Sequence, residues 1–199
     1  MKKITKADIN YILNREIEYL SDGVTNSLNP YHFFYLSTLV SDSQVSSRTI
    51  VLRKVAKNPL SISFNADYRS PKVKQLLNNT NCLVLFYDNK RKMQLRADCK
   101  ASINYENKIT KDVWSKTPLQ SRKCYMGEYN PSDSTSEWQP NIPLNYLKTD
   151  PDKDDSESGY KNFTVIELSI DCLDILELHH DGHVRFKYDP SGEFSFIAP

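Results

Sequence analysis

The sequence predicts a mainly β (α+β) fold, a small antiparallel barrel with helices beside it. Short runs of β-branched and aromatic residues recur between polar turns, a pattern typical of antiparallel strands. Apolar residues at helical spacing occur in only a few segments between and beside these runs. Several runs are apolar on both faces, which indicates a barrel whose outer face packs against helices or a second subunit.

The composition favours one soluble domain spanning residues 1–199. Single cores commonly extend over roughly 100 to 200 residues. The 26 Lys and Arg against 25 Asp and Glu leave a net charge of +1, too small a field to attract nucleic acid or an anionic membrane surface. No segment approaches the roughly 20 apolar residues of a membrane span. We expect a cytoplasmic protein with neither nucleic acid nor membrane as a partner.

A helix is predicted over residues 5–22. Thr5 and Asp8 match a capping box at its start, and Asp22-Gly23 supplies its end. The apolar residues that recur at helical spacing are Ile9, Ile12, Leu13, Ile17 and Leu20. One face of this helix is expected to pack on the body of the protein.

Strands follow from Tyr31. The runs YHFFYLSTLV, SSRTIVLRKV and LSISFNA predict an antiparallel meander, with turns at SDSQ and AKNP. SPKVKQLLNN predicts a short helix with Ser70 as N-cap and Pro71 at its first position. The sheet resumes in NCLVLFYD and KMQLRADCKASINY.

The second half predicts more varied structure. Residues 107–125 match a helix that Pro118 interrupts. Residues 130–160 are dense in Pro, Ser and Asp, which predicts a polar loop. The last block predicts strands around a two-residue Asp181-Gly182 turn, in which His180 and His183 pair across the hairpin.

Two arginines lie in a strand that otherwise favours burial. Alternation places Arg48 on one face with Ile50, and Arg53 on the other with Val51. A buried arginine needs a carboxylate or phosphate partner, since an unpaired buried charge costs several kcal/mol. The alternative is that both arginines reach solvent at strand ends or meet an aspartate from another strand.

A second basic group opens the helix after the third strand. Arg69, Ser70 and Lys72 stand where free N–H groups and the helix dipole favour an anion. Ordinary capping of a surface helix explains the same residues. Together with the strand arginines, they could converge on one phosphate.

These motifs, in this order, resemble the pyridoxamine 5'-phosphate oxidase family. The segments that carry the resemblance are RTIVLR, FNADYRSPKVKQLLNNT, MQLRADCKA, Trp114 with PLQSR, and the terminal VRFKY and IAP. It spans about Phe33 to Arg122 and returns from Asp171 to Pro199. The resemblance implies a six-stranded, FMN-binding split barrel of Greek-key topology, and a homodimer with FMN at the interface.

The resemblance also implies roles for individual residues. Arg48 and Lys72 would hold the FMN phosphate with help from Ser70, Gln94 would bind the flavin ring, and Arg185 would lie near the cofactor. The cofactor-binding set it implies is Arg48, Thr49, Ile50, Val51, Leu52, Arg53, Asn65, Ser70, Lys72, Gln94 and Arg185. On the substrate side it offers Arg53, Ser121 and His183, and it leaves the catalytic residue unknown.

The sequence departs from the family pattern in both parts of the site. Two usual phosphate or ribityl contacts are absent, because Asn65-Ala66 replaces a Tyr-Thr pair and Pro71 replaces an arginine; Arg69 could substitute. At four positions where the family has residues that contact the substrate or the flavin, this sequence has other residues: Val113, Thr117, Leu176 and Asp181. A pocket missing its main phosphate donors should bind vitamin B6 phosphates poorly.

Three smaller signals carry little chemistry. Cys82, Cys99, Cys124 and Cys172 lack Cys-x-x-Cys spacing and are interpreted as scattered buried thiols. The histidines 179, 180 and 183 match solvated turn residues better than metal ligands. The acidic run of residues 150–159 lacks EF-hand spacing. No metal site is predicted.

The leading hypothesis is an FMN-dependent oxidoreductase related to pyridoxamine 5'-phosphate oxidase, with hydride transfer from a small-molecule substrate to flavin N5. A flavin-binding or storage protein without turnover is the first alternative. A true pyridoxamine or pyridoxine 5'-phosphate oxidase is the second. A deazaflavin or haem in the same cleft stays open.

Overall fold

A computed structural model describes residues 4–199. The helices are α1 (Lys6–Gly23), α2 (Pro71–Asn78), α3 (Lys108–Lys116), α4 (Leu119–Arg122) and α5 (Lys153–Ser156), with short 3-10 helices η1 (Pro30–His32), η2 (Lys123–Tyr125), η3 (Leu144–Tyr146) and η4 (Glu157–Asn162). The strands are β1 (Phe33–Ser41), β2 (Gln44–Val51), β3 (Lys54–Lys57), β4 (Leu60–Asp67), β5 (Asn81–Asp88), β6 (Met93–Tyr105), β7 (Phe163–Glu177), β8 (Val184–Tyr188) and β9 (Phe194–Phe196).

The predicted fold class, antiparallel sheet with flanking helices, is confirmed. The described residues contain a sheet of nine strands, whereas the resemblance implied six. Its hydrogen-bonded order is β2-β1-β5-β6-β7-β4-β3, with β8 on β7 and β9 on β8. The additional strands arise because the predicted strand of residues 46–55 divides into two and the C-terminal block supplies three.

The division of residues 46–55 overturns the predicted meander. The amide of Leu52 donates to the carbonyl of His32, whereas the amide of Arg53 donates to the carbonyl of Ser63, both at 2.9 Å. The chain thus changes its hydrogen-bond partner between these two residues, from the segment leading into β1 to strand β4. Strands β2 and β3 consequently stand at opposite ends of the sheet order.

The chain divides into two compact units. Unit 1 comprises Met1–Phe64, Asn81–Lys100 and Leu168–Pro199, and unit 2 comprises Asn65–Thr80 and Ala101–Glu167. The organisation as a single domain stays a prediction. Each unit has buried apolar residues of its own, such as Phe34 and Leu36 in unit 1 and Trp114 and Phe163 in unit 2.

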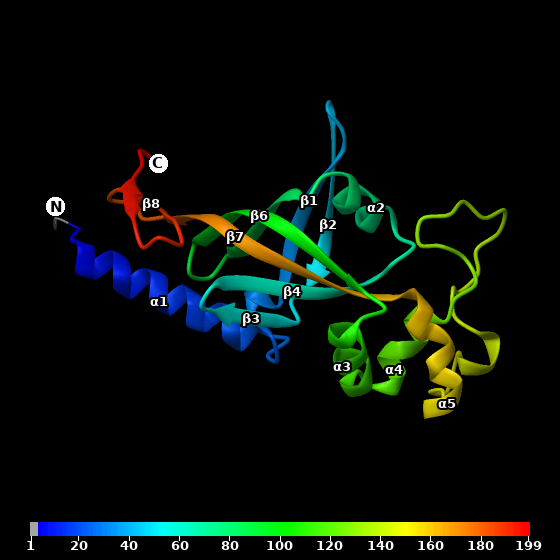
Figure 1. Ribbon diagram of the computed structural model, residues 1–199. Helices are drawn as coiled ribbons and strands as arrows, with labels where there is room; N and C mark the ends of the chain where they lie inside the picture. Colours follow the sequence, from blue (N-terminus) through cyan, green and yellow to red (C-terminus); the bar gives the residue numbers. More distant parts are fainter. Residues whose placement is uncertain (1–3) are drawn as a thin grey trace. The chain divides into compact units, whose positions relative to one another are not determined.

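Helix α1 of unit 1 begins as predicted. The Thr5 amide donates to the Asp8 carboxylate at 2.8 Å, and the Thr5 hydroxyl accepts from the Asp8 amide, so the capping box is complete. Its buried face consists of Ile9, Ile12, Leu13, Glu16, Leu20 and Gly23. Helix α1 contacts η1 and β3, and Figure 1 shows β3 beside the C-terminal part of the helix.

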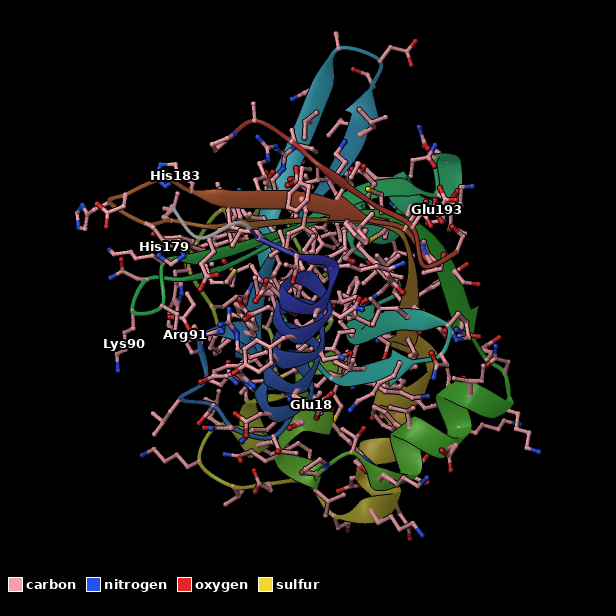
Figure 2. All side chains as sticks on the ribbon, turned by 90° about the vertical axis from the view of Figure 1, so that its left-hand side faces the viewer. Glu18, Lys90, Arg91, His179, His183 and Glu193 are labelled. Atoms are coloured by element: carbon pink, nitrogen blue, oxygen red, sulfur yellow. The ribbon has the colours of Figure 1, made fainter. Side chains whose placement is uncertain are left out.

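Glu16 is the one charged residue on the buried face of α1, and its side chain is 0% exposed. Both of its oxygens accept from Arg91 Nη1, at 2.8 and 2.9 Å, and it also accepts from Arg15 and from the Tyr31 hydroxyl. The Arg91 guanidinium lies 3.6 Å from the centre of the Tyr19 ring. Figure 2 shows Arg91 beside α1, so this network ties the β5–β6 turn to the helix.

The helical segment of unit 2 breaks at Pro118 as predicted, giving α3 and α4. Arg122, only 2% exposed, donates to the carbonyl of Trp114 at 2.8 Å, to Ser156 at 3.0 Å and to Glu157 at 2.8 Å. Figure 1 shows α3, α4 and α5 gathered together. The predicted polar loop is irregular up to residue 143 and then contains η3, α5 and η4.

The predicted hairpin near residue 181 exists, but its predicted turn is wrong. Strand pairing ends at Glu177 with Val184, and the Gly182 amide donates to the His179 carbonyl. His180 and Asp181 therefore occupy the centre of the turn. Gly182 has a φ of +121° and closes the turn, so His180 and His183 are not cross-strand partners.

The four cysteines are free, but they are not uniformly buried. Cys99 is buried, Cys82 and Cys172 are half-buried, and Cys124 is exposed, against the prediction. Cys82 and Cys99 are direct partners across β5 and β6. Burial raises the pKa of the Cys82 thiol to about 12, so this thiol is protonated at neutral pH.

Candidate functional site

Arg48 lies on the core-facing side of β2, in a row of direct strand partners with Leu36 of β1. Its guanidinium donates to the Leu36 carbonyl at 3.2 Å, to Thr38 Oγ1 at 2.6 Å and to Ser46 Oγ at 2.9 Å. Burial lowers the pKa of Arg48. These hydrogen bonds orient a half-buried guanidinium, a group that forms strong charge-assisted bonds with phosphates and carboxylates.

The rest of the predicted segment alternates as expected. Ile50 and Leu52 are buried, so their side chains are closed to a ligand. Thr49 and Arg53 are exposed and Val51 is half-buried, which places them toward the outer side of the sheet.

Gln94 lies on the opposite face of the sheet from Arg48. It pairs with Tyr87 of β5, and it shares its face with Arg96, two residues along β6. The row that contains Arg48 instead continues through Leu36 to Val84 in the core. The two side chains predicted to hold one flavin therefore point away from each other within a single chain.

Arg185 of β8 is held by a carboxylate. Its Nε and Nη2 donate to the two oxygens of Asp174, at 3.0 and 2.8 Å. Arg96 Nη1 stands farther from the same carboxylate, at 3.8 Å. The hydrogen bonds from Arg185 lower the pKa of Asp174, which is 6% exposed. Arg185 is thereby fixed on the outer face that also carries Gln94.

The pKa of Asp174 predicts a pH effect on stability. A carboxyl whose pKa is lower in the folded state than its usual value of about 3.9 stabilises the fold above that value, and this stabilisation is lost as pH falls through the folded pKa. The wild type should have a higher free energy of unfolding than Asp174→Asn at neutral pH, and this difference should become smaller below about pH 4. Urea unfolding across pH measures it. The control is Asp171→Asn, which removes an exposed carboxylate from the same strand. A stability difference between wild type and Asp174→Asn that does not change with pH would contradict the lowered pKa of Asp174.

In unit 2, Ser70 and Lys72 begin helix α2. Ser70 is the N-cap residue and is 1% exposed, but its hydroxyl makes no capping bond and instead accepts from Lys72 Nζ at 3.1 Å. The amides of Val73 and Lys74 donate to the Ser70 carbonyl, at 3.0 and 3.4 Å, and Pro71 has no N–H, so the first turn of α2 offers a ligand fewer backbone donors than the sequence predicts. Asn65 of β4 is half-buried in the same unit.

The predicted substitute Arg69 is already engaged. Its Nε and Nη2 donate to Asp67 at 3.0 and 2.7 Å, and its Nη1 donates to the Gly127 carbonyl at 3.0 Å. Hydrogen bonds to Asp67 raise its pKa. Arg69 therefore anchors residue 127 of the following loop and offers little to a phosphate.

The sequence missed a stacked pair in unit 2. The rings of Tyr68 and Tyr105 lie 3.6 Å apart at 9°, just before the start of α2. Tyr68 follows strand β4, and Tyr105 ends strand β6. The two are distant in sequence, so no local signal could have found them.

The substrate candidates have different surroundings. Ser121 is half-buried in α4 of unit 2. His183 is exposed on the β7–β8 connection, where its Nδ1 accepts from the His179 amide at 3.1 Å (Figure 2). Among residues 4–199 no three metal-ligating side chains cluster, and no helix has the length and apolar character of a membrane span.

The predicted site residues are thus divided between the units. Unit 1 holds Arg48, Thr49, Ile50, Val51, Leu52, Arg53, Gln94, His183 and Arg185, and unit 2 holds Asn65, Ser70, Lys72 and Ser121. Within unit 1 the outer face brings Gln94 and Arg185 onto one side of the sheet. The meeting of Arg48 and Lys72 at one phosphate stays a prediction.

A family model matches the first half of the chain. The model of the pyridoxamine 5'-phosphate oxidase FMN-binding domain matches residues 15–104. The resemblance to this family is confirmed. The matched range contains Arg48, Ser70, Lys72 and Gln94, whereas Ser121, His183 and Arg185 lie beyond it. No curated protein matches the sequence.

Solved structures share the fold of the pyridoxamine 5'-phosphate oxidase family. A pyridoxamine 5'-phosphate oxidase-related, FMN-binding protein from Nostoc punctiforme has a TM-score of 0.63 at 19% identity, covering 98% of this chain and 96% of that one. PhzG from Burkholderia lata, in complex with tetrahydrophenazine-1-carboxylic acid, has a TM-score of 0.65 at 15% identity, covering 96% and 92%. ChuZ from Campylobacter jejuni has a TM-score of 0.56 at 10% identity, covering 98% and 65%.

Proposed function

We propose that this protein is an FMN-dependent oxidoreductase that works as a homodimer. The observation that carries the proposal is the match of the FMN-binding domain to residues 15–104, a range that holds the predicted phosphate and ring contacts. The Nostoc neighbour is described as FMN binding, which supports the same cofactor here.

The residues present fit a phosphorylated flavin. Arg48 is a half-buried cation whose guanidinium donates to the Leu36 carbonyl and to the hydroxyls of Thr38 and Ser46, and a phosphate beside it would accept charge-assisted hydrogen bonds. The start of α2 adds the positive charge of Lys72 and the positive end of the helix dipole. Gln94 offers an amide to the polar edge of the ring, and Arg185 is held on the same face as Gln94.

The two faces of the sheet favour a dimer. Arg48 and Gln94 project from opposite faces, so one flavin that touches both needs one of them from a second copy. The outer face around Gln94 also exposes large apolar side chains, including Phe33 at 48% and Tyr87 at 38%. A second copy covering them would remove apolar surface from water, worth roughly 25 cal/mol per Å².

The chain's own part in the reaction is binding and electrostatics. When bound, a flavin supplies hydride transfer at N5. Gln94 would orient the ring by hydrogen bonding its polar edge. Arg185 would favour the negative charge that a reduced flavin gains near N1 and O2, because Asp174 holds the guanidinium in place beforehand. Arg53 and His183, both exposed, would face the substrate.

The proposal predicts a yellow, dimeric protein. Visible spectroscopy of the purified protein, with FMN added if it is colourless, should show bound flavin, and light scattering should show a dimer. Protein that is colourless and binds no added FMN would overturn the proposal.

Anaerobic mixing with NADPH, NADH and pyridoxamine phosphate in turn then separates the functional classes. Bleaching by a nicotinamide identifies an oxidoreductase with that electron donor. Bleaching by pyridoxamine phosphate would favour the true oxidase, which the replacement of the family's phosphate donors by Val113 and Thr117 disfavours. Bleaching by none of the three would favour a flavin-binding protein without turnover.

A further inference from the structure

Arg96 of β6 lies on the outer face of unit 1, and its nearest carboxylate is too distant for a hydrogen bond. It stands two residues from Gln94 on the same strand, so both side chains project from one face. Its side chain is 43% exposed. The family resemblance gave it no role, and its proximity to Gln94 places it at the edge of the proposed flavin site.

The carboxylate nearest to Arg96 is largely taken by another cation. Asp174 receives two hydrogen bonds from Arg185, at 3.0 and 2.8 Å, through both of its oxygens. Arg96 approaches one of those oxygens only to 3.8 Å, beyond hydrogen-bond distance. Asp174 thus holds Arg185 firmly and Arg96 loosely, which leaves the Arg96 donors available to a ligand.

Charged side chains of both signs gather around Arg96. Asp98 lies on the same face of β6, and Asp174, Arg185 and Lys187 share one face of β7 and β8. An anion next to Arg96 would meet a guanidinium that Asp174 engages only at 3.8 Å, whereas a neutral or cationic ligand would gain no charge pair there.

An apolar surface adjoins the cation. Arg96 is the direct partner of Leu85 on β5, and Leu85 is the direct partner of Tyr35 on β1. Tyr35 is 52% exposed and Leu85 is half-buried, so a flat apolar group can lie across them. A cation at the end of an apolar row is suited to a molecule with a flat apolar body and one acidic group.

We propose that the substrate is a planar, aromatic or conjugated acid whose carboxylate is bound by Arg96. Asp174 acts as a positioning residue, since it keeps Arg185 from competing for the acid and sets the position of both guanidinia. This inference rests on the proposed function, because Gln94 puts the flavin on the same face. The body of the acid would then lie over Leu85 and Tyr35, next to the row of Gln94 and Tyr87.

The test compares benzoate with benzyl alcohol, which has the same ring but no charge. Titration calorimetry on the full chain, with and without FMN, should show that benzoate binds and that Arg96→Gln weakens it about tenfold or more. Arg96→Lys should restore part of the affinity. Lys100→Gln removes a cation about four residues along the same strand, roughly 13 Å away, and should leave benzoate binding unchanged.

Four results would overturn the inference. They are undetectable benzoate binding to the wild type, equal benzoate affinity in Arg96→Gln, equal weakening by Lys100→Gln, and benzyl alcohol binding as tightly as benzoate. FMN affinity is measured separately by quenching of flavin fluorescence, and Arg96→Gln should retain it. If the variant loses FMN, Arg96 serves the cofactor and the inference fails. If the wild type binds no FMN, the proposed function fails whatever benzoate does.

Discussion

Arg48→Glu should lose at least about two orders of magnitude in FMN affinity. The variant removes donors aimed at the proposed phosphate and puts a carboxylate in their place. Charged hydrogen bonds contribute about 1.5–3 kcal/mol each, and each 1.4 kcal/mol is about tenfold in affinity. Quenching of flavin fluorescence during titration measures the loss.

The control for Arg48→Glu is Lys54→Glu, which makes the same charge change at an exposed position nearby in the sequence. Arg48→Lys serves if the reversal unfolds the protein, because it keeps the charge and loses the forked geometry. Circular dichroism confirms folding in each case. Unchanged FMN affinity in a folded Arg48→Glu protein would show that the phosphate is bound elsewhere.

Lys72→Glu tests the same phosphate site with less risk of unfolding the protein. A negative charge in the first turn of α2 is favourable for the helix itself, by about 0.3–1 kcal/mol, so the fold should not suffer. FMN affinity should nevertheless fall, because Lys72 is the predicted second cation on the phosphate. Lys74→Glu, exposed on the same helix, is its control.

Glu16→Ala should destabilise the protein by about 3 kcal/mol or more, since it leaves the buried side of Arg91 without its main counter-charge. Glu16 is fully buried, and it also accepts from Arg15 and Tyr31. Burial and the charge of Glu16 raise the pKa of the Tyr31 hydroxyl, which remains a donor over the whole neutral range. Urea unfolding measures the change.

The control for Glu16→Ala lies half a turn away on α1. Glu18 is exposed and pairs with Lys57, so Glu18→Ala should cost less than about 1 kcal/mol (Figure 2). Equal costs for the two variants would show that the Arg91 network adds nothing beyond a surface ion pair.

Local sequence signals predicted the elements whose causes are local. The Thr5 capping box, the start of α2 at Pro71 and the break at Pro118 were all found where the sequence placed them. Alternation also placed Arg48 and Ile50 on the same face of their strand, as the structure has them. Each of these features depends on residues within one or two turns of helix or on neighbours along one strand.

The errors have causes that are distant in the chain. The strand of residues 46–55 breaks because Leu52 and Arg53 bond to different partners, and nothing in its own residues indicates this. The His180 and His183 pairing failed because the register is set by β7 and β8, and the turn residues alone suggested a shorter connection. The Tyr68 and Tyr105 stack was missed for the same reason.

The sequence by itself determined the antiparallel class, the main helices and the identity of the cations from which a flavin site could be built. Only the tertiary structure decided which sheet face each of them uses, how Asp174 divides its oxygens between Arg185 and Arg96, and how Glu16 is neutralised. The physical reason is that capping and alternation act between near neighbours, whereas the partner of a charge is chosen by strand register and packing between segments far apart in the chain.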